Sequence, residues 1–414
     1  MPGEEYDGVA GEQRRPLIIN HDFDSSVDIL HQNEDTISPL PFSHTETLAL
    51  PSLPVPNQRL ASLDVFRGLT VALMILVDDV GRAFPSLNHS PWFGVTLADF
   101  VMPFFLFVVG ISIALVFKKV SSKPNATKKV VLRTIKLFLL GLLLQGGYFH
   151  GRGKLTYGVD LSKIRWLGVL QVHCEVRGSL EPPCNAVGFV DRLILGEYHM
   201  YQRPVYIRTK ECSVNSPDYG PLPPNSPGWC LAPFDPEGIL SSLMAAITCF
   251  MGLQYGRIIV LLQDNKQRVL LWSVFSFALL LVGYILEILG IPLSKALYTL
   301  SYMFITAGAS GLVLTAIYYI VDIEHHRKPT ILLQWMGMNA LVVYALAACD
   351  IFPAAIQGFY WHSPENNLVD ASEALMQAIF HSEKWGTMAF VIVEILFWGI
   401  FSGFLHKKGI YIKL

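Results

Sequence analysis

The sequence predicts an all-α membrane protein: a multi-span helical bundle of about eight transmembrane helices with a long lumenal loop. The 414-residue chain is 52% hydrophobic and only 15% charged, which is not the composition of a soluble enzyme. Its apolar residues form runs of roughly 20 residues, the length that crosses a bilayer. Basic residues gather in alternate connections between these runs. The net charge of −2 gives no signal for nucleic-acid binding, so nucleic acid is not an expected partner.

Residues 1–57 form the first region, and we expect a disordered cytoplasmic tail there. They are rich in Pro, Ser, Asp, Glu and His and contain few long apolar runs. They also lack the apolar core that a secretory signal needs.

Eight candidate spans follow the tail. Three lie in residues 58–149, and five lie in residues 238–414 together with a short cytoplasmic tail. The second span contains Pro103, a break that neighbouring helices can repair. The candidate spans are 61–80, 96–117, 130–149, 238–256, 268–289, 296–320, 331–349 and 387–405.

The orientation follows from the basic residues in the short connections. They cluster between spans two and three, four and five, and six and seven, and after span eight. With eight spans, all four clusters lie on the side of the N-terminus. Both termini are therefore expected to be cytoplasmic, and the connection after the first span is expected to be lumenal.

The long segment 150–237 falls on the lumenal side and holds four of the six cysteines, Cys174, Cys184, Cys212 and Cys230. In an oxidising compartment these four predict two disulfides, for which three pairings are possible. The alternative is free thiols in a loosely ordered loop.

A polar hairpin joins the first two spans. His89 lies between Asp78 and Asp79, where the first span ends, and Asp99, where the second begins. A histidine held near carboxylates can act as a general base or nucleophile, because imidazole titrates near neutral pH and a carboxylate fixes its tautomer. The alternative is that the carboxylates cap helices, as suits Asp99 in a first turn, and that His89 is only interfacial.

Two further polar positions lie within the spans. Asp64 and Arg67 are three residues apart, so they share a helix face, where the arginine can pair with the acid or grip a phosphate. Asn339 is an amide in an apolar helix and should face another helix or a ligand, packing being the simpler role. The scattered histidines show no metal-ligand spacing.

Three segments resemble the catalytic core of the heparan-alpha-glucosaminide N-acetyltransferase family. They are residues 59–69 (Arg-Leu-Ala-Ser-Leu-Asp-Val-Phe-Arg-Gly-Leu), residues 89–113, which begin His-Ser-Pro-Trp-Phe-Gly, and residues 337–344 (Gly-Met-Asn-Ala-Leu-Val-Val-Tyr). Residues 182–188, 201–206 and 234–238 resemble the lumenal loop of its plant members. The resemblance runs in order from about residue 59 to the end of the chain.

The resemblance implies an N-acetyltransferase of a lysosome- or vacuole-like organelle. Such an enzyme takes acetyl from cytosolic acetyl-CoA, its co-substrate, and transfers it to a lumenal amino sugar, a heparan-alpha-glucosaminide-like terminus. The active histidine falls on His89, which either accepts the acetyl group or removes a proton from the attacking amine. The other candidates are Asp64, Arg67, Asp78 and Asn339 for acetyl-CoA, and Asp79, Asn88 and Asp99 for the acceptor.

The chain departs from the family in two places. Asp78 stands where the family has an asparagine, which changes charge and donor capacity. Residues 164–171 resemble the entry to another helix, but residues 172–178 follow directly, so two membrane helices after Gln171 are expected to be lacking. The alternative function is therefore a non-catalytic or transporter-like membrane protein of the same family. Expected partners are the lipid bilayer, acetyl-CoA and the acceptor, and a homodimer stays open.

Overall fold

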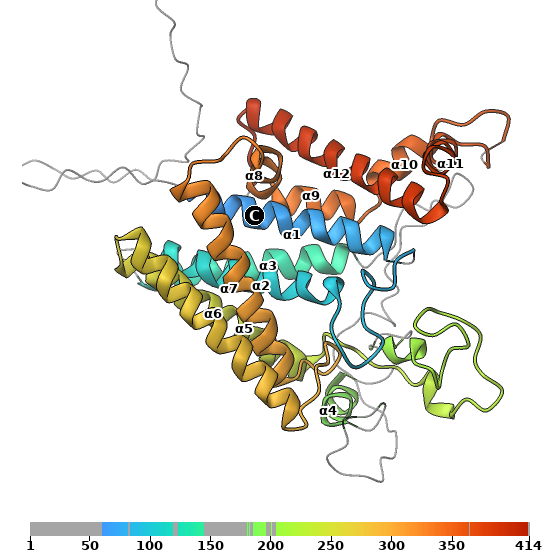
Figure 1. Cartoon of the computed structure of the whole chain (residues 1–414), viewed down its shortest axis with the longest axis horizontal. Coiled ribbons are helices and arrows are strands. Elements are labelled where there is room, and N and C mark those ends of the chain that lie inside the picture. The colour runs from blue at the N-terminus through green and yellow to red at the C-terminus, as the bar shows by residue number, and fades with distance from the viewer. Residues whose placement is uncertain are drawn as a thin grey trace, which may run out of the picture. The chain divides into compact units, whose positions relative to one another are not determined.

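The computed structural model describes residues 60–81, 83–118, 123–144, 180, 182, 185–195, 200, 204–363 and 365–412. All regular elements in these ranges are helices, apart from one isolated bridge between Tyr360 and Asn367 (Figure 1). The predicted all-α class is confirmed. The tail, Cys174, Cys184 and the junction after Gln171 lie outside the described residues.

The helices follow one another with short connections through most of the described chain. In order they are α1 (Ala61–Val80), α2 (Leu97–Lys118), α3 (Lys123–Leu144), α4 (Ala186–Leu195), the 3-10 turns η2 (Val205–Arg208) and η3 (Gly228–Leu231), α5 (Ile239–Leu261), α6 (Asn265–Ile288), α7 (Leu300–Tyr318) with the π turn η4 (Tyr319–Ile323), α8 (Ile331–Met338), α9 (Ala340–Ala347), α10 (Ile351–Gln357), α11 (Leu368–Phe380) and α12 (Glu383–Lys407).

Five of the described helices are long and apolar enough to cross a membrane: α2, α5, α6, α7 continued by η4, and α12. A sixth span results if α9 and α10, bent by 50° relative to each other, count as one. The helical membrane bundle is thus established, whereas the number of eight spans stays a prediction. One predicted span needs correction: 331–349 is divided into α8 and α9 at Asn339, whose backbone (φ −117°, ψ 29°) is not helical.

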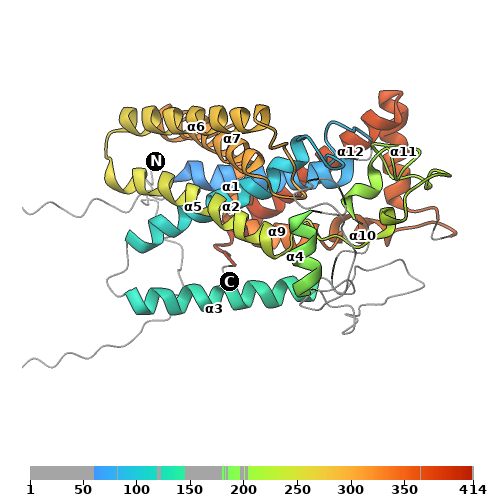
Figure 2. The same cartoon turned by 90° about the horizontal axis from the view of Figure 1, so that it is seen from below.

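Helix α1 lies in the middle of the bundle, against α2, α7, α8 and α12, while α6 and α7 run side by side (Figures 1 and 2). Close contacts between helices use glycine, as is common where helices associate in lipid. At Gly110 of α2, an added Cβ would lie 1.9 Å from the carbonyl oxygen of Cys249 on α5. At Gly252 of α5, it would lie 2.0 Å from the carbonyl oxygen of Phe107. The α2 and α5 backbones therefore lie in direct contact at these two glycines.

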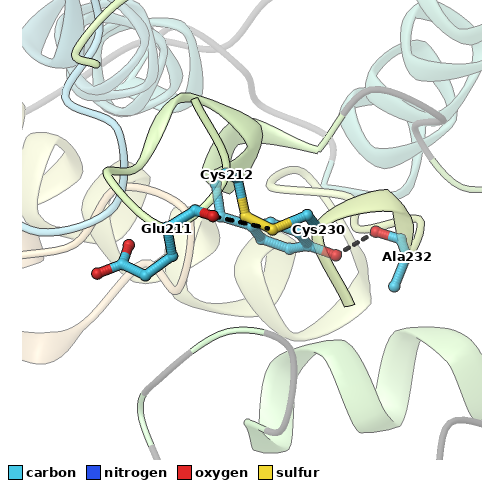
Figure 3. The surroundings of a disulfide bond; sticks show 5 residues. Glu211, Cys212, Cys230 and Ala232 are labelled. Atoms are coloured by element: carbon cyan, nitrogen blue, oxygen red, sulfur yellow. Dashed lines mark hydrogen bonds between the residues drawn. A yellow bond between two sulfur atoms is a disulfide. The ribbon is translucent and has the colours of Figure 1, made fainter. Parts of the chain in front are cut away.

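Residues 204–238, which we call the cap, pack against the hairpin between α1 and α2. A disulfide between Cys212 and Cys230, with 5.5 Å between the Cα atoms, closes the cap (Figure 3). This is one of the two predicted disulfides. The Trp92 ring of the hairpin packs against Tyr206 and Phe234 of the cap, with ring centroids 5.6 and 5.1 Å away. This aromatic cluster fixes the hairpin under the cap.

Candidate active site

The turn of the hairpin is stabilised by the Asp99 side chain, which accepts hydrogen bonds from backbone N–H groups of the hairpin. Asp99 lies in the first turn of α2 and is fully buried. Its Oδ2 accepts from the backbone N–H of Ser90 at 3.2 Å and of Thr96 at 3.0 Å. The Thr96 hydroxyl also donates within the hairpin, 2.5 Å from the carbonyl oxygen of Asn88. A carboxylate at a helix N-terminus is stabilised by these donors and by the helix dipole.

The other carboxylate oxygen of Asp99 holds His89. Oδ1 lies 2.8 Å from His89 Nδ1. An ionised carboxylate only accepts, so Nδ1 carries the hydrogen and Nε2 keeps its lone pair. The His89 side chain is 38% exposed, whereas that of Asp99 is 0% exposed. The imidazole can therefore contact a substrate while the buried carboxylate holds it in place. The pair can therefore act as a general base or nucleophile oriented by a carboxylate.

Asn88 stands beside this pair: its side-chain Oδ1 accepts from the backbone N–H of His89 at 2.8 Å. Asp78 and Asp79 occupy the last turn of α1 with exposed side chains. Asp78 lies within electrostatic range of His89. The structure thus brings Asn88, His89 and Asp99 into contact and leaves the two α1 acids at the edge of the group.

Lys295 is a member of this group that the sequence analysis missed. Its Nζ lies 3.2 Å from His89 Nδ1, 3.4 Å from Nε2 and 4.0 Å from Asp99 Oδ1. Burial lowers the pKa of the Lys295 ammonium below its ordinary value, and the Asp99 carboxylate opposes that decrease. The available signal was a lone lysine in a short connection on the hairpin side, where few basic residues are expected.

Two of the remaining candidates, Asp64 and Arg67, lie further back along α1, and the third, Asn339, lies between α8 and α9. Arg67 donates through Nη1 to Asp64 Oδ1 at 3.1 Å and through Nη2 to Ser112 Oγ at 2.5 Å. Eleven residues separate Arg67 from Asp78, or about 16 Å of helix. Asn339 is 1% exposed, and its amide nitrogen and oxygen have no hydrogen-bond partner among the described residues. The eight predicted residues therefore form a hairpin group and a deeper group, not one cluster.

Among the described residues, no three His, Cys, Asp or Glu side chains are placed to hold a metal ion. The donors of the hairpin group instead suit proton transfer, because they combine an imidazole with one oriented lone pair, a buried carboxylate and an amine.

Comparison with known proteins agrees with the motifs. Residues 59–158 match the family model described as "Heparan-alpha-glucosaminide N-acetyltransferase, catalytic", a range that contains Asp64, Arg67, His89 and Asp99. Proteins named heparan-alpha-glucosaminide N-acetyltransferase from Mus musculus and Homo sapiens are 25% and 24% identical over 423 and 421 residues, covering 83% of this chain. The chain spans 60% of the length of each relative. The resemblance to this family is confirmed, at low identity over most of the chain.

Proposed function

We propose that this chain is a transmembrane acetyltransferase that moves acetyl from cytosolic acetyl-CoA to a lumenal amino sugar such as a heparan-alpha-glucosaminide-like terminus. The observation that carries the proposal is the hydrogen bond between His89 Nδ1 and Asp99 Oδ1 at 2.8 Å. It leaves Nε2 as an oriented base at the exposed end of the α1–α2 pair. The family model and the two named relatives support the same reaction class.

As a general base, His89 takes one proton and returns it. The acceptor amine attacks the thioester carbonyl carbon while its N–H proton passes to Nε2. The C–S bond then breaks, and the imidazolium returns the proton to the departing sulfur. The products are an amide and the free thiol, so atoms and charge balance. Asp99 keeps the hydrogen on Nδ1 and stabilises the transient imidazolium.

As a nucleophile, the same Nε2 would attack the thioester first and carry the acetyl group to the amine in a second step. The two routes differ in one observable. With labelled acetyl-CoA and no acceptor, the nucleophilic route leaves acetyl on the His89 peptide in a burst, whereas the base route leaves none.

The deeper group would serve the donor. The Arg67 side chain is 30% exposed. Its planar guanidinium can donate two parallel hydrogen bonds to a phosphate. The unpartnered amide of Asn339 can satisfy a polar group of an extended ligand. A donor with phosphates at one end and a thioester at the other fits a path from Arg67 toward His89. Asp78 would serve the thioester end of the donor, and Asp79, Asn88 and Asp99 would face the acceptor.

The test is acetyl transfer by the purified protein in nanodiscs, with acetyl-CoA and glucosamine and product detection by mass spectrometry. The variant His89→Ala should abolish transfer, and full retained activity would sink the assignment. His326→Ala is the matched control, since His326 is exposed in the connection after α7.

A second candidate is a transporter-like or non-catalytic protein of the same family. It is favoured by the direct junction after Gln171 in the sequence. Counterflow of a solute through vesicles without any acetylated product would support it against the enzyme.

The proposal includes a multi-pass protein in a lysosome- or vacuole-like organelle with both termini in the cytoplasm. Protease protection of terminal tags on intact organelles tests this orientation. Cross-linking in native membranes tests for a homodimer.

A further inference from the structure

Lys295 lies beside the imidazole and not merely near the site. Its Nζ is almost equidistant from the two ring nitrogens of His89, at 3.2 and 3.4 Å. Nδ1 is already engaged by Asp99, so the lone pair within reach of an ammonium hydrogen is that of Nε2. A charged lysine only donates, so it pairs with the neutral ring and repels the protonated one.

The connection that carries Lys295, residues 289–299, is fixed on both sides of it. Before it, the carbonyl oxygen of Leu293 accepts from the backbone N–H of Gly94 in the hairpin at 2.8 Å. After it, the hydroxyl of Tyr298 lies 3.0 Å from that of Thr248 on α5, and the Tyr298 backbone has a left-handed φ of +46°. A left-handed tyrosine persists only when its surroundings enforce it. The connection is therefore anchored to the hairpin and to α5 on either side of Lys295, which places this lysine beside the His89 ring.

The charges around the ring oppose one another. Asp99 on α2 and Asp78 on α1 favour an imidazolium, and Lys295 opposes it. Glu237 of the cap and Arg208 of η2 act one step further out, on Lys295 and on Asp99 respectively. Lys295 is the cation that touches the ring among the described residues.

We propose that Lys295 is a positioning residue whose ammonium opposes protonation of the His89 ring, so that the ring stays neutral to a lower pH than it would without this neighbouring charge. The inference rests on the proposed function of His89, but the protonation of His89 can be measured without any acetyl transfer. Loss of the cation should make the ring easier to protonate. In the reaction, the protein would then lose activity first at low pH, with the KM for acetyl-CoA unchanged.

The experiment is modification by diethyl pyrocarbonate, which reacts with neutral imidazole, followed by mass spectrometry of the His89 peptide across pH 4.5–8 (roughly the range over which imidazole titrates). Lys295→Met should move the midpoint of modification about one unit toward higher pH, the shift expected for loss of a neighbouring charge. Lys295→Arg keeps the charge and should leave the midpoint in place. Lys384→Met, at an exposed lysine in the first turn of α12, is the matched control.

Lys295→Gln is a second neutral variant, so that the comparison does not depend on the folding of one protein. The inference is overturned if the pH midpoint of His89 modification stays unchanged in both neutral variants. It is also overturned if Lys295→Arg shifts this midpoint as much as the neutral variants do. If instead His89→Ala retains acetyl transfer, the proposed function fails while the protonation result for Lys295 stands.

Discussion

Gly68 on α1 and Gly337 on α8 lie against each other's backbones. A Cβ added at Gly68 would be 1.8 Å from the carbonyl oxygen of Leu333, and one added at Gly337 would be 1.7 Å from that of Asp64. Asp64 and Arg67 are on this stretch of α1, so the same contact that joins α1 to α8 positions the deeper group and the adjacent Asn339.

Gly337→Ala is therefore expected to destabilise the bundle. The added methyl group must push α8 away from α1, and such overpacking costs about 1–3 kcal/mol. The measurement is thermal unfolding of the purified protein in detergent. Gly228→Ala is the control, because a Cβ at Gly228 meets no atom within 4 Å. Equal unfolding midpoints for the two variants would contradict the close α1–α8 contact.

Asp99→Asn should leave the fold intact and lower kcat about 10²–10⁴-fold. The amide oxygen can still accept from Ser90 and Thr96, but an amide nitrogen facing His89 donates to Nδ1 and forces the hydrogen onto Nε2. Steady-state kinetics with acetyl-CoA and glucosamine measure the effect, with little change expected in KM. A kcat within twofold of the parent would show that the tautomer of His89 does not matter.

Arg67→Ala should raise the KM for acetyl-CoA about tenfold, the loss expected for one charge-assisted contact. The comparison substrate is acetyl-pantetheine, which carries a thioester but lacks the nucleotide phosphates. If Arg67 acts on phosphate, the variant and the parent use this substrate equally well. If both substrates lose affinity alike, Arg67 only supports the structure through Asp64 and Ser112. Arg327→Ala, at a side chain that is 55% exposed, is the control.

The raised pKa of the buried Asp191 carboxyl leads us to expect that the stability of the protein depends on pH. It is fully buried in α4 and accepts from the backbone N–H of Ile239 at the start of α5. Burial raises the pKa of this carboxyl from 3.8 to about 6. The folded state thus binds a proton that the unfolded state has released between about pH 4 and 6. Stability from this group is present below that window and falls as the pH rises through it, by at most about 3 kcal/mol.

Asp191→Asn should remove that fall. The measurement is the unfolding midpoint between pH 4 and 7 for the parent and the variant. Glu365→Gln, at an exposed side chain before α11, should keep the slope of the parent. An identical slope in Asp191→Asn would show that another group causes it.

Hydropathy alone predicted the approximate positions of most long helices in the described residues. The predicted spans 96–117 and 387–405 correspond to α2 and α12 within a few residues at each end. It failed to divide the span at Asn339, because one amide changes a window average little while it can end a helix locally. The helix predicted from residue 296 begins only at Leu300, because the Thr299 side chain caps α7 there by accepting from the backbone N–H of Tyr302.

The candidate site was likewise predictable only where its residues are close together in the sequence. The partnership of His89 with Asp99 was predictable because ten residues separate them along one hairpin. The partnership of His89 with Lys295 was not, because 206 residues separate them. The packing of α7 against α2 and the hydrogen bond between Gly94 and Leu293 bring them together. A single sequence carries no pattern that reports such a distant pair.

That separation has a consequence for biogenesis. At about 5–20 residues per second, a ribosome takes roughly 10–40 s to pass from His89 to Lys295. A nascent chain that stops before residue 295 can hold His89 against Asp99 but has no ammonium beside the ring. The group of His89, Asp99 and Lys295 is complete only after α6 has been synthesised, so a chain terminated before residue 295 lacks the finished site.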